Sequence, residues 1–137
     1  MIILVTGSRE FDSFQMVDDA LHKAIEDPWE RFEVVHGNCP TGADAFAAHA
    51  VDAINDHFRY NGWPPVAHTR MPANWTRHGK AAGPIRNRAM VDYVKANPDP
   101  KKICLAFLQK NAKNAGTYNC TATAVEAGIP VTRFWSK

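Results

Sequence analysis

The sequence predicts an α/β fold, with a doubly wound, mainly parallel sheet of about five strands and helices on both faces. Short β-branched and aliphatic runs alternate with segments whose apolar residues recur at helical spacing. This alternation is typical of parallel strands joined by right-handed helical crossovers. At 137 residues, we expect one domain spanning residues 1–137.

The expected strands are the apolar runs. The first is unbroken and suits a strand buried on both faces. The run ICLAFL gives the clearest later strand, and FEVVH, VAHTRM and IPVTRFW give the others. The five predicted strands are residues 2–6, 32–36, 66–71, 103–108 and 129–135.

The expected helices lie between these strands. The first follows Asp12 or Ser13 as a cap. The third starts near Pro84, because proline suits the first helical position, and stops at the ANPDP segment, because proline cannot continue a helix. The predicted helices are residues 14–25, 43–58, about 84–95 and 118–127.

Composition excludes several classes of protein and site. A formal charge of +2 is too small to indicate non-specific nucleic-acid or membrane binding. The three cysteines form no C-x-x-C pair, which suits a reducing compartment, and the histidines lack metal-site spacing. No segment has the length of a signal peptide or a membrane span. We therefore expect a cytoplasmic protein with no metal, no required cofactor, no membrane partner and no nucleic-acid partner.

Glycine-containing junctions follow the first two strands. In TGSRE, Gly7 permits a sharp turn, and Ser8 and Arg9 follow at the carboxyl edge of the sheet, where they either contact an anion or form a simple turn. In HGNCPTGAD, Gly37 and Gly42 bracket a loop that feeds a helix. Asp44 there either stabilises the helix start, or accepts a hydrogen bond from a ribose hydroxyl or orients a water.

The segment GKAAGPIRNR carries Lys80, Gly83, Arg86 and Asn87 around the start of the third helix. Cations at a helix N-terminus oppose the helix dipole by roughly 0.3–1 kcal/mol each. A purely structural helix would place Asp or Glu there. The absence of acids in this turn favours a bound anion.

Two further features lie near the same edge. NAGT brings Gly116 and Thr117 to the start of the fourth helix, where capping by Thr117 is a sufficient explanation. Trp75 either stacks on a base or covers the core. No Ser-His-Asp or Cys-His arrangement is evident, so no catalytic residue is assigned beyond Asp44 as a candidate.

With these motifs in order, the sequence resembles the YspA-type, YpsA-related branch of the SLOG superfamily, which includes the DprA/Smf and LOG proteins. The motifs that carry the resemblance are VTGSREF, VVHGNCPTGAD, PANWTRHGKAAGPIRNRAM, LAF before a loop with GT, and EAGIPV. The resemblance implies a Rossmann-like fold with a pocket for a nucleotide or nucleotide-derived ligand. It implies these site residues: Gly7, Ser8, Arg9, Gly37, Gly42, Ala43, Asp44, Trp75, Lys80, Gly83, Pro84, Arg86, Asn87, Gly116 and Thr117.

The chain departs from the family pattern after the fourth strand. The family has PGGxGT there, whereas this chain has LQKNAKNAGT. LOG-type phosphoribohydrolases carry glutamates after Gly-Thr, whereas Tyr118, Asn119 and Cys120 follow here, and Glu126 lies too far along the helix to replace them. Without a carboxylate to stabilise an oxocarbenium ion, N-glycosidic cleavage is disfavoured.

We therefore expect a sensor or binding module for a nucleotide or ADP-ribose-like phosphate ligand, with Arg9, Lys80 and Arg86 on phosphate. Asp44 and Asn87 bind ribose hydroxyls or fix the loops. The alternative is a hydrolase of nucleoside phosphates or ADP-ribose derivatives that uses Asp44 as general base. Single-stranded DNA binding in the manner of DprA is less favoured, because no basic stripe is interleaved with aromatic residues. The resemblance also implies a possible homo-oligomer.

Overall fold

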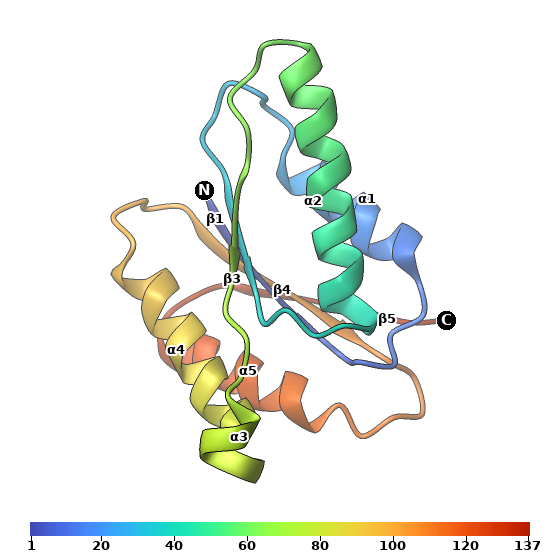
Figure 1. The fold of residues 1–137 in the computed structure, drawn as a ribbon, viewed down its shortest axis with the longest axis vertical. Coiled ribbons are helices and arrows are strands. Elements are labelled where there is room, and N and C mark those ends of the chain that lie inside the picture. Colours follow the sequence, from blue (N-terminus) through green and yellow to red (C-terminus); the bar gives the residue numbers. More distant parts are fainter.

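A computed structural model describes residues 1–137. Its core is one five-stranded sheet in the order β3-β2-β1-β4-β5, with every neighbouring pair parallel (Figure 1). The α/β prediction is confirmed, and the sheet is parallel throughout. The strands are β1 (Ile2–Gly7), β2 (Glu33–His36), β3 (Ala67–Arg70), β4 (Lys102–Leu108) and β5 (Val131–Trp135). The helices are α1 (Phe14–Ala24), α2 (Gly42–Tyr60), α3 (Trp75–His78), a 3₁₀ turn η1 (Gly79–Ala81), α4 (Ala82–Ala96) and α5 (Ala115–Glu126).

Helices cover both faces of the sheet. Helices α1 and α2 pack on one face, and α4 and α5 pack on the other (Figure 1). The central strand β1 contributes Ile3 and Val5 to the first core and Ile2 and Leu4 to the second. Because successive side chains of a strand point to opposite faces, a strand covered on both sides needs an unbroken apolar run.

The chain order reverses between β1 and β4. After β3 the chain crosses to the other face of the sheet, so the loops that follow β1 and β4 diverge. Ligands of open α/β sheets bind in the crevice at such a reversal, outside the carboxyl ends of the strands. None of the helices has the length and apolar character that crossing a bilayer requires.

The predicted start and cap of the first helix are confirmed, whereas α4 and α5 start earlier than predicted. Ser13 caps α1, accepting the N–H of Met16 at 3.2 Å. Helix α4 begins before Pro84, so this proline is its third residue and Arg86 lies beyond the first turn. Helix α5 begins at Ala115, which makes Thr117 its third residue rather than its cap.

The long connection before α4 also contains structure that the sequence did not predict. It forms α3 and η1. Asn74 caps α3 by accepting the N–H of Arg77 at 3.0 Å. This short helix places Trp75 beside the start of α4. The indole ring lies so close to Gly83 that a Cβ added there would contact it.

Candidate ligand-binding site

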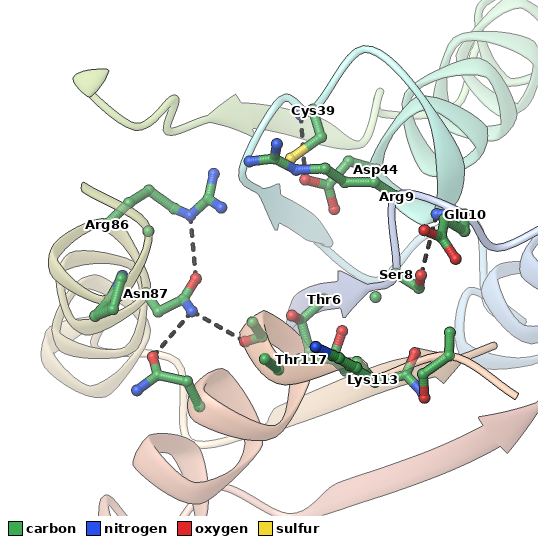
Figure 2. Close-up of a pocket in the computed structure, with 18 of the residues that line it drawn as sticks. Thr6, Ser8, Arg9, Glu10, Cys39, Asp44, Arg86, Asn87, Lys113 and Thr117 are labelled. Atoms are coloured by element: carbon green, nitrogen blue, oxygen red, sulfur yellow. Dashed lines mark hydrogen bonds between the residues drawn. The ribbon is translucent and has the colours of Figure 1, made fainter. Parts of the chain in front are cut away.

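A cavity of about 740 Å³ lies at the carboxyl edge of the sheet, at the ends of β1 and β4 (Figure 2). Its walls come from the loops after β1, β2 and β4 and from the starts of α3, α4 and α5. It brings together most of the site residues expected from the sequence. Those that line it are Gly7, Ser8, Arg9, Asp44, Trp75, Gly83, Pro84, Arg86, Asn87, Gly116 and Thr117.

Four expected site residues do not line the cavity: Gly37, Gly42, Ala43 and Lys80. Lys80 lies exposed in η1. Gly42 and Ala43 pack the start of α2 against the loop after β1, where the Ala43 N–H donates to the carbonyl of Ser8 at 3.2 Å. Gly42 has φ +72, and a Cβ there would collide with the Ser8 carbonyl oxygen. These two residues shape the cavity from behind its wall.

Gly37 acts through Arg86. The Arg86 guanidinium donates from Nη1 to the Gly37 carbonyl oxygen at 2.8 Å. A Cβ at Gly37 would collide with that guanidinium. Glycine therefore permits the close approach that holds α4 against the loop after β2.

Asn87 connects the starts of two helices. The residue is buried, with 3% of its surface exposed. Its Oδ1 accepts from Arg86 Nε at 3.1 Å, and its Nδ2 donates to the Gly116 carbonyl at 3.1 Å and to Asn119 Oδ1 at 3.0 Å (Figure 2). Because both ends of the amide have protein partners, Asn87 fixes the relative position of α4 and α5.

Arg9 and Trp75 meet at the mouth of the cavity. The Arg9 guanidinium carbon lies 5.1 Å from the centroid of the Trp75 ring. This is a cation–π contact between the loop after β1 and helix α3. Trp75 is 48% exposed, so its indole does not cover the core and is accessible for stacking. Arg9 and Arg86 extend toward the space between them from opposite walls (Figure 2).

Asp44 is the buried carboxylate of the site, with 6% exposure. Burial raises the pKa of Asp44, against the hydrogen bond from the Cys39 N–H at 3.2 Å, which favours the ionised form. Burial and the neighbouring Asp44 likewise raise the pKa of the Cys39 thiol. The pocket therefore holds a carboxyl group that is easier to protonate than an exposed one, next to an unreactive thiol.

The start of α5 supplies neutral donors. Asn114, in the left-handed conformation at φ 53, uses its side chain to fold the preceding loop: it accepts from the Gln109 N–H at 3.0 Å and donates to the Gln109 carbonyl at 3.0 Å. It does not cap the helix. The N–H groups of Gly116 and Thr117 consequently have no protein acceptor, and free N–H groups at a helix start are suited to anions.

Positive charge at the cavity is not neutralised by ion pairs. Arg9, Arg86 and Lys113 line it, and none of them lies within ion-pair distance of a carboxylate. The lining carboxylates are Glu10 and Asp44. Residues 57–91, which supply α3 and the start of α4, contain six Lys or Arg and no Asp or Glu. Arg86 is the one charged residue of this segment that lines the cavity, and the segment brings no carboxylate to the wall.

Sequence reasoning missed several lining residues, including Thr6, Glu10, Cys39 and Lys113. The loop before α5 departs from the family pattern, so no motif singled out Lys113. Its only signal was its position between a strand end and a glycine-containing helix start. No group of three or more His, Cys, Asp or Glu side chains could hold a metal ion.

Comparison with known proteins identifies the family of the chain. A profile of the YspA, cpYpsA-related SLOG family (YAcAr) matches residues 1–78, which include β1, β2, the loop that carries Ser8 and Arg9, and the start of α2 with Asp44. The Gene 61 protein of Mycobacterium phage D29 is 36% identical over 137 residues, covering 98% of this chain and 97% of the phage protein. No solved structure matches the chain. The chain belongs to the YspA, cpYpsA-related SLOG family.

Proposed function

We propose that this protein binds a nucleotide or a nucleotide-derived, ADP-ribose-like ligand in the cavity at the carboxyl edge of the sheet. The observation that carries the proposal is the convergence of Arg9, Arg86 and Lys113 on one cavity without ion-pair partners. A phosphate-bearing ligand would neutralise this charge. Membership in the SLOG family supports a nucleotide-related role.

Phosphate fits the wall formed by the loop before α5. The unpaired N–H groups of Gly116 and Thr117 and the ammonium of Lys113 lie in this wall. Arg86 contributes more weakly than an unengaged arginine, because Nη1 and Nε already donate to the protein and only Nη2 has no protein acceptor. Lys80, outside the lining, is replaced by Lys113 in this assignment.

The base fits at the mouth. The half-exposed indole of Trp75 offers a stacking surface, and such stacking contributes about 1–3 kcal/mol per base. Arg9 now covers that surface, and a ligand phosphate would compete with the ring for its guanidinium. Asp44 lines the cavity, and its carboxylate, which accepts from the Cys39 N–H through Oδ2, would also accept a hydrogen bond from a ribose hydroxyl.

Thermal-shift titrations test the proposal with AMP, ADP, ADP-ribose, ribose 5-phosphate and inorganic phosphate. Wild-type protein is expected to be stabilised by one or more of the nucleotides, and Arg9→Ala and Lys113→Ala are expected to reduce that shift. Arg59→Ala, which removes an exposed arginine from the end of α2, is the matched control and is expected to retain it. Absence of a shift with every nucleotide would contradict the proposal.

A second candidate function is hydrolysis of the same class of ligand. The observation in its favour is Asp44, a buried carboxyl group of raised pKa that faces the cavity, as expected of a general base or acid. Incubation with ADP-ribose and nucleotides, followed by chromatography, separates binding from turnover. Products formed by the wild type but not by Asp44→Asn would establish hydrolysis. A ligand that is recovered intact would support binding without turnover.

A further inference from the structure

A pair of histidines lies behind the cavity wall. His36 is the last residue of β2 and is fully buried, and His68 lies on the neighbouring edge strand β3. Their Nε2 atoms are 2.6 Å apart. On its other side, His68 Nδ1 lies 3.7 Å from Oδ1 of Asp52 on α2.

The backbone fixes where the protons of this pair lie. The N–H of Asn38 points to His36 Nδ1 at 2.9 Å, so that nitrogen is an acceptor and carries no proton. A neutral His36 therefore carries its proton on Nε2 and donates it to His68 Nε2. His68 in turn carries its own proton on Nδ1, facing Asp52.

This arrangement leads directly to the ligand cavity. Asn38 has a left-handed backbone, with φ 56, and its N–H bond to His36 holds the turn that follows β2. The preceding residue, Gly37, presents the carbonyl that accepts from Arg86 Nη1 at 2.8 Å. The Gly37 carbonyl and the Asn38 N–H belong to the same peptide group. This one peptide group therefore connects the His36 imidazole to the Arg86 guanidinium through two hydrogen bonds.

An additional proton on either histidine would break one of the hydrogen bonds of the pair. A proton on His36 Nδ1 would break the bond from Asn38, and one on His68 Nε2 would set two N–H groups against each other. The charged groups around the pair are Arg70 on β3, Arg86 on α4 and Asp52 on α2. Burial, the first cause, and the neighbouring histidine lower the pKa of His36 to about 4, and burial lowers that of His68.

We propose that His36 and His68 are positioning residues for the ligand cavity. In the neutral pair, His36 accepts from the Asn38 N–H and donates to His68. This holds the turn at residues 37–38 so that the Gly37 carbonyl anchors Arg86. Addition of a proton to the pair releases that anchor and weakens binding of an anionic ligand. The binding half of this inference rests on the proposed function, whereas the anchoring half does not.

The first test uses wild-type protein without ligand. Long-range ¹H–¹⁵N correlation NMR at pH 7 is expected to show the proton of His36 on Nε2 and that of His68 on Nδ1. The Arg86 Nη1–H resonance, whose proton the Gly37 carbonyl accepts, is expected to be protected from exchange relative to a free guanidinium at the same pH, and to lose that protection as the pH falls toward 4. A His36 proton on Nδ1, or an Arg86 signal that does not respond when the pair is protonated, would overturn the proposal.

The second test compares two substitutions. His36→Asn keeps an acceptor at the position of Nδ1, and His36→Phe keeps the ring volume but removes both nitrogens. We expect His36→Phe to lose the protection of the Arg86 Nη1–H that the Gly37 carbonyl accepts, and to weaken ADP-ribose binding roughly tenfold, as the loss of one hydrogen bond implies. His36→Asn is expected to stay within about threefold of wild type and to bind without the loss of affinity that wild type shows below about pH 5.

The controls keep the two proposals apart. His22→Gln changes an exposed histidine of α1 and is expected to match wild type in every measurement. If wild type binds no nucleotide of the panel, the proposed function fails, and the Arg86 resonance alone decides the positioning role. If His36→Phe retains both the Arg86 protection and the affinity of wild type, the positioning role is excluded.

Discussion

The guanidinium of Arg86 and the carbonyl of Gly37 are joined by a 2.8 Å hydrogen bond across the wall of the cavity. The two residues are 49 positions apart in the chain, and they connect the start of α4 to the turn after β2. Hydrogen bonds with an ionised donor are roughly twice as strong as neutral ones. Arg86 also donates to Asn87, whose amide donates to the Gly116 carbonyl, so the two side chains together connect the turn after β2, α4 and α5.

Substitution of Gly37 tests this relationship. Gly37→Ala would place a methyl group in the space of the guanidinium, and we expect it to destabilise the protein by about 1–3 kcal/mol and to abolish the ligand-induced thermal shift. Chemical denaturation measures the loss. Gly116→Ala, with nothing within 4 Å of the added atom, serves as the stability control and is expected to be neutral or stabilising by up to about 1 kcal/mol.

Gly42 and Gly62 form a matched pair. Both have φ +72, but a Cβ at Gly42 would strike the Ser8 carbonyl, whereas nothing lies within 4 Å of one at Gly62. Gly62→Ala is expected to cost about 1 kcal/mol for backbone strain alone. Gly42→Ala is expected to cost at least about 2 kcal/mol more, because it separates α2 from the loop after β1. Equal losses in urea denaturation would show that the close approach at Gly42 contributes nothing.

Asn87 is expected to stabilise the protein through its three side-chain hydrogen bonds. Asn87→Ala should lower the free energy of unfolding by about 2–4 kcal/mol, since it leaves Arg86 Nε and the Gly116 carbonyl without their partner. Asn119→Ala removes only one of the three bonds, and we expect a loss below about 1 kcal/mol. If the two substitutions cost the same, Asn87 does not link the two helices energetically.

Stability is expected to fall in mild acid because of His36. Its pKa is about 4 in the folded protein, against 6.5 in the unfolded chain, chiefly because of burial. Between pH 6.5 and 4 the unfolded chain therefore binds a proton that the folded protein does not, and the free energy of unfolding decreases as the pH falls, by about 3 kcal/mol in all. Above pH 6.5 both states are neutral and the effect is absent.

The measurement for this prediction is the difference between wild type and His36→Asn. Asp44, whose pKa is raised, acts with the opposite sign, since its contribution to stability is lost as the pH rises through its folded pKa. Its contribution cancels in the difference between the two proteins. Urea denaturation from pH 4 to 7 should give a smaller slope for His36→Asn, and parallel curves would contradict the assignment.

Much of this fold could be predicted because buried strands and helices require apolar residues at regular spacing in the sequence. The apolar run of β1 reflects a strand covered on both faces, and the helical spacing of α1 and α2 reflects one buried stripe each. The motifs that follow β1 and β2 predicted the edge of the sheet at which the cavity lies, because the carboxyl ends of parallel strands lie together.

The remainder depends on contacts that spacing does not encode. The early start of α5 depends on Asn114, whose left-handed backbone and side-chain bonds fold the loop. The roles of Gly37 and Asn87 depend on Arg86, which approaches from a helix distant in sequence. The GKAAGPIRNR motif predicted Lys80, which lies in η1 outside the lining, whereas Lys113, which no motif singled out, lines the cavity.

The most direct measurement of the central claim is ¹H–¹⁵N chemical-shift mapping with ADP-ribose. We predict the largest changes at the backbone amides of Ser8, Gly116 and Thr117 and at the indole N–H of Trp75, with the response saturating at one ligand per chain. No change at these groups, or changes confined to the amino-terminal edge of the sheet around Arg31 and Asn97, would contradict the claim that this cavity binds a nucleotide-derived phosphate.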